Sequence, residues 1–184
     1  MISPPSWRHR GFTLMEVTIT IAVICILFML SIPAYQQVRE RVARANCSSN
    51  LRQLYVGAEL YLQQNRHWPQ VNPALLKAPN HAYDEAWIEA YLPFGITRQT
   101  WICPTIQRDL GGPDFTQSQN YRADYIAMPF DSKPFSPSKY PSQPWFAERG
   151  NVHGTGNLVV LGNGSVTDLQ SMSPVAAAAA AGGL

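Results

Sequence analysis

The stretch RHRGFTLMEVTITIAVICILFMLSIPAY, residues 8–35, decides how this chain is organised. Between Phe12 and Ala34 the only charged residue is Glu16. A helix of this length, rising about 1.5 Å per residue, crosses a hydrocarbon core of about 30 Å. A carboxylate costs about 2.5–3.5 kcal/mol at the centre of a spanning helix and less near its end. We therefore expect a membrane helix in which Glu16 has a cationic partner.

Cleavage between Gly11 and Phe12 would create that cation. The new α-amino group of Phe12 would have a pKa of roughly 7.7–8.0 and so carry positive charge near neutral pH. Glu16 would then lie one helical turn away, and could pair with this amine on its own chain or on a neighbouring one. A pair between chains would set the stagger of packed helices.

Two other interpretations of the same stretch compete with this one. A secretory signal peptide fits the basic residues 8–10, but small residues suited to signal peptidase are missing around Ile32–Tyr35, and the apolar run is long. A plain membrane anchor would tolerate Glu16 near the interface. Neither explains why the acid follows Gly11 at this spacing.

The segment GFTLMEV, with Gly11 before the cut and Glu16 as the fifth residue after it, resembles the type IV pilin and pseudopilin family. Pro33, deep in the helix, also matches the family pattern. The resemblance implies cleavage after Gly11 by a prepilin peptidase on the cytoplasmic side and N-methylation of Phe12. It also implies use of Glu16 in filament assembly.

Three later segments are similar to a bacterial pseudopilin subgroup with a late His-x9-Asp-Gly motif. They are NCSSNLRQLYVGAELYLQQNRHWPQ, WICPT and VHGTGNLVVLGNGSV. His153 and Gly164 fit the motif's spacing, whereas Asn163 stands where the subgroup has Asp. We expect Asn163 to preserve the turn, because Asn tolerates the left-handed conformation, but not a carboxylate role.

The pattern divides the chain into five regions. Residues 1–11 form a leader, 12–34 a transmembrane helix, 35–65 its amphipathic continuation, 66–170 a globular loop and sheet region, and 171–184 an Ala/Gly-rich tail. Apolar residues three or four apart predict that the helix continues past a bend at Pro33 to Asn65. These residues are Tyr35, Val38, Val42, Ala45, Cys47, Leu51, Leu54, Ala58 and Leu62.

The second half of the chain should cover the apolar face of this helix with a sheet. We expect partly helical structure in residues 72–92, strands within 120–128, 144–148 and 157–169, and a Pro/Ser-rich loop between the first two. Gly162-Asn163-Gly164 predicts a hairpin turn with positive φ angles. The predicted fold class is α+β and pilin-like, with a long N-terminal helix packed on a small antiparallel sheet.

The three cysteines lie in different settings. Cys25 falls in the membrane run, where it acts as a small apolar residue. Cys47 and Cys103 would lie outside the cytoplasm, and a disulfide between them would contribute about 4 kcal/mol on the chain-entropy account. Two separate thiols are the alternative. No Cys-x-x-Cys or Cys-x-x-His occurs, so the spacing predicts no metal site.

Cofactor binding has little support in the sequence. Major pseudopilins of type II secretion hold calcium in C-terminal loops, and this resemblance makes calcium the one candidate ligand. The loop carboxylates lack dense ligand spacing; they are Asp109, Asp114, Asp124 and Asp131. His153 could be a ligand or a structural hydrogen-bond donor. The aromatic residues Trp68, Trp87, Trp101 and Trp145 are expected to pack in the core.

The expected function is that of a non-enzymatic filament subunit, a pseudopilin of a type II secretion or related system. The chain has no Gly-x-Ser-x-Gly motif and no phosphate-binding glycine loop, and its net charge of +2 favours no nucleic-acid partner. Expected partners are the prepilin peptidase, other pilin or pseudopilin subunits, the inner-membrane assembly platform and the bilayer. The alternatives are a type IV pilus or DNA-uptake pilin that binds an external partner, and a membrane-anchored periplasmic enzyme.

The expected location is the bacterial inner membrane, with a single pass, a cytoplasmic N-terminus and a periplasmic C-terminal domain. Flanking charge alone leans slightly the other way, because Arg39, Arg41 and Arg44 outnumber Arg8 and Arg10. The cleavage motif decides the orientation, because the peptidase acts on the cytoplasmic side.

Intact-mass analysis of the membrane-extracted protein tests the processing. We expect a chain that begins at Phe12 and carries one added methyl group. A mature chain beginning at Met1, or at any residue other than Phe12, would remove the cation that Glu16 requires and refute this interpretation.

Overall fold

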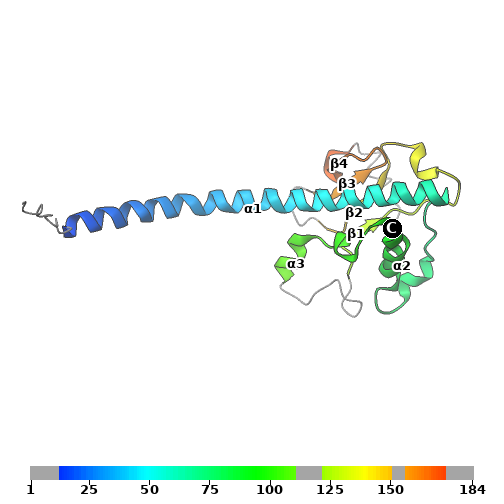
Figure 1. Ribbon diagram of the computed structural model, residues 1–184, viewed down its shortest axis with the longest axis horizontal. Helices are drawn as coiled ribbons and strands as arrows, with labels where there is room; N and C mark the ends of the chain where they lie inside the picture. Colours follow the sequence, from blue (N-terminus) through cyan, green and yellow to red (C-terminus); the bar gives the residue numbers. More distant parts are fainter. Residues whose placement is uncertain (1–12, 111–121, 151–155, 173–184) are drawn as a thin grey trace, which may run out of the picture. The chain divides into compact units, whose positions relative to one another are not determined.

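The computed structural model describes residues 13–110, 122–150 and 156–172 (Figure 1). The chain divides into two compact units, Met1–Arg41 and Val42–Leu184. Helix α1, Leu14–Asn65, has 52 residues and belongs to both units. The predicted helix of about 50 residues ending at Asn65 is thus confirmed, as is the α+β fold class.

The described part of the N-terminal unit is helical and apolar. The large apolar side chains of residues 14–32 are exposed, and one helix is long and apolar enough to cross a membrane by length and composition. The backbone is helical through Pro33 and Ala34, whose side chains lie outside the described residues. The bend at Pro33 therefore stays a prediction.

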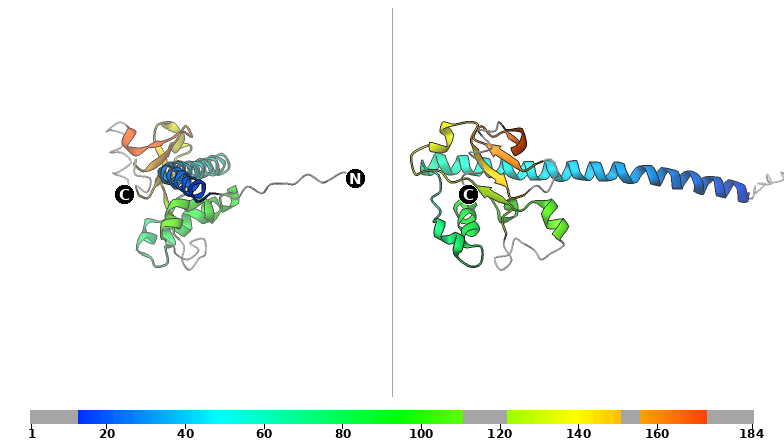
Figure 2. Two further views of the ribbon diagram at one scale, coloured as in Figure 1. Left: turned by 90° about the vertical axis from the view of Figure 1, so that its left-hand side faces the viewer. Right: turned by 180° about the vertical axis from the view of Figure 1, so that it is seen from behind.

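The C-terminal unit contains a four-stranded sheet (Figure 2). Its strands are β1 Tyr125–Ala127, β2 Pro144–Glu148, β3 Leu158–Leu161 and β4 Val166–Asp168, in the order β1-β2-β3-β4. All neighbouring strands are antiparallel. Each strand lies within a segment where the sequence predicts one, so the small antiparallel sheet is confirmed.

A three-residue loop joins β3 to β4. Leu161 N donates to Ser165 O at 2.9 Å and Gly164 N donates to Leu161 O at 2.9 Å, so the loop is 162–164. Gly164 has φ +78°, whereas Asn163 does not have positive φ. The hairpin is confirmed, but Asn163 supports it differently from the prediction: its side chain accepts a hydrogen bond from Ser165 N at 2.9 Å. In this type of three-residue loop only the last residue, here Gly164, needs the left-handed conformation.

Short helices lie before, between and after the strands. The 3₁₀ helix η1 Pro73–Lys77, α2 Ala82–Tyr91 and η2 Leu92–Phe94 confirm the helical content predicted for residues 72–92. The sequence did not predict the other short helices, which are η3 Arg98–Trp101, α3 Pro104–Leu110, η4 Ser136–Lys139 and η5 Leu169–Ser171. They are too short to show helical periodicity, although Pro104 at the first turn of α3 is a typical start signal.

The core of the C-terminal unit lies between α1, the sheet and α2. One stripe of α1 is buried, consisting of Cys47, Leu51, Leu54, Ala58 and Leu62. It packs in one cluster with residues of the sheet and of α2, including Tyr125, Phe146, Leu158 and Tyr91. The four tryptophans at 68, 87, 101 and 145 are buried, so their predicted core role is confirmed.

The first part of the predicted apolar face is not buried. Tyr35, Val38, Val42 and Ala45 are all exposed. At about 100° per residue, Val42 and Ala45 lie about 140° and 160° around the helix from Cys47. The stripe instead extends back from Cys47 to buried Ala43. The sequence prediction joined two stripes that face in different directions.

Two leucines of α1 provide a matched test of this core. Leu54 is fully buried, whereas Leu60 is 44% exposed. Leu54→Ala should lower the free energy of unfolding by about 2–5 kcal/mol, because it leaves a cavity. Leu60→Ala should cost much less. Urea titration of the full chain in detergent, followed by tryptophan fluorescence, measures both. Equal losses would contradict the assignment of the buried stripe.

Candidate functional site

The N-terminus of α1 forms a reciprocal capping arrangement. Glu16 N donates to Thr13 Oγ1 at 3.2 Å, and Thr13 N donates to Glu16 Oε2 at 3.5 Å. Thr13-x-x-Glu16 is a capping-box sequence, in which the two side chains satisfy backbone donors that the first helical turn leaves without intrahelical partners. The sequence interpretation missed this local role of Glu16, although the motif itself could have revealed it.

The capping bond to the Glu16 carboxylate is weak. At 3.5 Å it lies beyond the usual 2.7–3.2 Å for an N–H donor and an oxygen acceptor. Both Thr13 and Glu16 are exposed. The carboxylate therefore stays available to a stronger cationic partner. Gly11 and Phe12, the predicted cleavage and methylation residues, lie outside the described residues.

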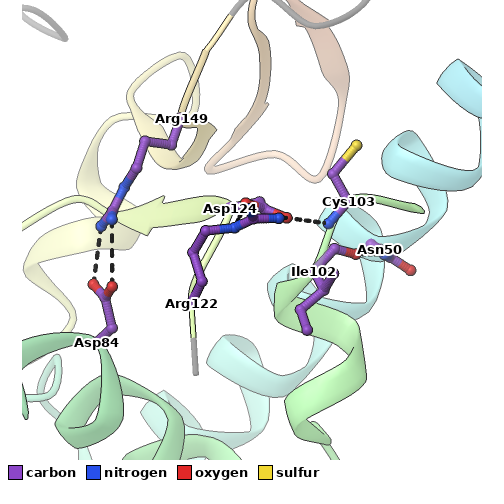
Figure 3. Close-up of polar contacts among 7 residues, drawn as sticks. All are labelled: Asn50, Asp84, Ile102, Cys103, Arg122, Asp124 and Arg149. Carbon is purple, nitrogen blue, oxygen red and sulfur yellow. Dashed lines mark hydrogen bonds and ion pairs between the residues drawn. The ribbon is translucent and has the colours of Figure 1, made fainter. Parts of the chain in front are cut away.

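A second arrangement fixes the segment Trp101–Cys103 within the C-terminal unit (Figure 3). From α1, Asn50 Nδ2 donates to Ile102 O at 3.0 Å. From the segment before β1, Asp124 Oδ2 accepts from Cys103 N at 2.8 Å, and Asp124 N donates to Trp101 O at 2.8 Å. Three hydrogen bonds from two sides thus hold three consecutive residues.

Asp124 is the centre of this network. It is buried, and Arg122 Nε lies 2.6 Å from its Oδ1, while Arg122 Nη2 donates to Oδ2 at 3.1 Å. Burial raises the pKa of Asp124, and the hydrogen bond from Arg122 opposes this rise. The Asp124 carbonyl also accepts from Arg149 N at 2.7 Å, which ties the network to the end of β2. The arrangement positions backbone and gives no sign of bond-making chemistry.

Arg149 extends this network to α2. Its Nη1 and Nη2 donate to the two carboxylate oxygens of Asp84 at 3.3 and 2.9 Å, as Figure 3 shows. Asp84 is buried, while the Arg149 side chain is 42% exposed. Such a two-point contact fixes the direction of the guanidinium as well as its charge. It joins the first turn of α2 to the residue after β2.

The cysteines at 47 and 103 meet in the core beside Glu148. The two Sγ atoms and a Glu148 carboxylate oxygen all lie within 4.8 Å of one another, and all three residues are buried. Cys47 comes from α1, Cys103 precedes α3, and Glu148 ends β2. Sequence spacing predicted no metal site, and this group of donors could not be found from local motifs because its members come from three distant elements.

The two sulfur atoms have different electrostatic settings. A hydrogen bond to Cys103 and burial raise the pKa of Cys47. The pKa of Cys103 is lowered, first by that same hydrogen bond and then by the backbone N–H groups of Thr105 and Ile106 at the start of α3. Cys103 is therefore the better thiolate of the pair, and Cys47 is the one that keeps its proton.

The other predicted site residues are not brought together. Asp131 is on the surface beside Lys133, and Asp124 is held by Arg122, so the described carboxylates of the calcium candidate lie in separate settings. The Asp109 side chain, Asp114 and His153 lie outside the described residues, as do the other masked residues of the His-x9-Asp-Gly pattern, 154 and 155. Calcium binding and the role of His153 stay predictions.

Comparisons with known proteins give a partial match to a secretion protein. No family model matches the chain, and no solved structure matches it. The chain is similar to the type II secretion system core protein G of Escherichia coli (strain K12), with 29% identity over 68 residues. The match covers 37% of this chain and 47% of that protein, so it spans about half the length of the relative. This similarity supports the pilin-like family, and with the apolar helix it fits a single-pass inner-membrane protein.

The Asp84–Arg149 contact can be tested by removing one partner. Arg149→Met should lower the free energy of unfolding by about 1–3 kcal/mol, because a buried carboxylate loses its charged donors. Adding Asp84→Asn to this variant should restore part of the loss. Arg52→Met, at an exposed position of α1, is the control. Urea titrations that show no difference between Arg149→Met and Arg52→Met would contradict the structural role given to this pair.

Proposed function

We propose that this chain is a pseudopilin-like structural subunit of a type II secretion or related filament. The observation that carries the proposal is a single helix whose N-terminal half exposes a continuous apolar surface while its C-terminal half packs in a small α+β unit. The similarity to a type II secretion core protein supports it. The chain would act by assembly rather than by catalysis.

Processing would come first. A prepilin peptidase would cut after Gly11 on the cytoplasmic side, and Phe12 would become the methylated N-terminus. The apolar helix would then remain in the inner membrane with the C-terminal unit outside the cytoplasm. Assembly would take place at an inner-membrane platform, and the partners of each subunit would be other pilin or pseudopilin subunits.

Glu16 would change partners during assembly. Among the described residues of the single chain, its carboxylate accepts one long hydrogen bond, from Thr13 N at 3.5 Å. An α-amino group carries a full positive charge, so it attracts the carboxylate by a charge–charge interaction that the neutral N–H of Thr13 does not offer. The Phe12 amine of an adjacent subunit would therefore compete well for the carboxylate. The lipid-like surroundings of packed apolar helices would strengthen this pairing further.

Two substitutions separate the charge of Glu16 from its capping role. Glu16→Gln keeps an acceptor at the capping position and removes the charge, whereas Thr13→Ala removes the cap and keeps the charge. We expect Glu16→Gln to be cleaved after Gly11 but to give at least a tenfold lower yield of filaments. Thr13→Ala should assemble nearly as well as the wild-type chain.

The measurement is the amount of the subunit in sheared, pelleted filaments relative to the membrane fraction, in cells that hold the peptidase and the platform. Normal filament yield from Glu16→Gln would eliminate the charge-pairing role. Equal loss from both variants would show instead that Glu16 acts by capping its own helix.

A further inference from the structure

Cys47 and Cys103 are brought together by a precise set of polar contacts. Asn50 lies three residues after Cys47, so both face the same side of α1. Asn50 Nδ2 donates a hydrogen bond to the carbonyl oxygen of Ile102 at 3.0 Å, and Cys103 is the next residue in the chain. On the far side, Asp124 holds the backbone N–H of Cys103 at 2.8 Å. The Cys-x-x-Asn pattern on the helix thus positions the Cys-Pro segment against it.

The sulfur atoms lie in the core with no other cysteine of the described residues beside them. Both residues are fully buried, and their Sγ atoms lie within 4.8 Å of each other. We propose that Cys47 and Cys103 form a disulfide bond in the mature protein, which covalently joins α1 to the start of α3. This inference rests on the proposed function for its orientation, because thiols are oxidised outside the cytoplasm and kept reduced within it.

The bond would form by thiol–disulfide exchange with an external disulfide, on a protein or a small molecule. The Cys103 thiolate attacks that disulfide and releases one thiol of the oxidant. Cys47 then loses its proton, attacks the sulfur of Cys103 and releases the second thiol. Two thiols of the chain are oxidised and the oxidant's disulfide is reduced to two thiols, so two electrons and two protons leave the chain. Both sulfurs are buried, so the exchange precedes closure of the core.

A metal ion is the other occupant that these residues suggest. Two thiolates and the Glu148 carboxylate would carry three negative charges, so a divalent cation would leave a net charge of −1 in the core. A disulfide at the same place has no charge and leaves a single carboxylate, whose Oε2 already accepts from Leu158 N at 3.3 Å. Both occupants therefore leave a net charge of −1, and net charge does not decide between them. Structural zinc sites take four protein ligands, whereas the described residues bring only three such donors together here, which favours the disulfide.

The consequence for a filament subunit is mechanical. The bond closes residues 47–103 into a covalent loop around the contact between α1 and the rest of the C-terminal unit. Force applied along α1 could then not draw the helix out of that unit by breaking non-covalent contacts alone. The bond would also restrict the unfolded chain and so favour the folded state.

Alkylation of the full chain tests the bond, with Cys25 as an internal standard. Cells are quenched with acid, and the denatured protein is treated with iodoacetamide before or after reduction and weighed intact. We expect one added group without reduction, on Cys25, and three after reduction. Three groups without reduction would overturn the proposal. Zinc released by the denatured chain in a 1:1 ratio, together with three groups, would assign the site to a metal instead.

A second variant separates failure of the bond from failure of the proposed orientation. Leu76 is 67% exposed in the C-terminal unit, so Leu76→Cys should react with a membrane-impermeant maleimide added to spheroplasts, whereas the wild-type chain should not. If Leu76→Cys is labelled and the unreduced wild-type chain takes up three alkyl groups, the disulfide is overturned and the orientation stands. Absence of labelling overturns the orientation, and the alkyl count still decides the bond.

Unfolding adds a readout that does not depend on mass. A reductant should lower the urea midpoint of the wild-type chain in detergent, and should leave that of the Cys47→Ala/Cys103→Ala variant unchanged. An equal response of both chains to the reductant would overturn the proposal.

Discussion

One stripe of α1 imposes the architecture of the C-terminal unit. Leu51, Leu54, Ala58 and Leu62 follow one another at helical spacing and are almost completely removed from solvent. An isolated helix cannot bury such a stripe, so another layer has to cover it. The sheet and α2 supply that layer, and the large aromatic side chains of both fill the space between. The same helix leaves the large apolar side chains of residues 14–32 exposed, so its two parts differ in burial.

The polar contacts of the C-terminal unit position backbone segments against this core. Burial of a polar group is unfavourable unless its hydrogen bonds are made, and Asp124 makes them with Arg122 and with the backbone of Cys103. Asn50 does the same for the carbonyl of Ile102. These contacts hold a short connecting segment to a fixed place on α1. Their role in the described structure is to position backbone.

The sequence predicts those parts of the fold that depend on local periodicity. Helix α1, the strands and the β3–β4 hairpin all follow from patterns over a few residues. Short helices such as α3 were not predicted, because seven residues are too few to show the helical periodicity of apolar residues. The apolar face was misjudged at Val42 and Ala45, since residues spaced by three or four can drift around a helix from one stripe to the next. The capping role of Glu16 could have been predicted from the Thr13-x-x-Glu16 motif. The proximity of Cys47, Cys103 and Glu148 could not, because it depends on tertiary structure alone.

The separation in sequence between α1 and its partners affects how the protein is made. Arg44 near the start of the buried helix pairs with Asp168 near the end of the described chain. A ribosome completes the helix long before it reaches the last strand, so the apolar stripe stays without its sheet throughout most of synthesis. The stripe cannot be covered until nearly the entire described chain has been made. Folding of the C-terminal unit therefore waits for β4, the last strand of the sheet to be synthesised.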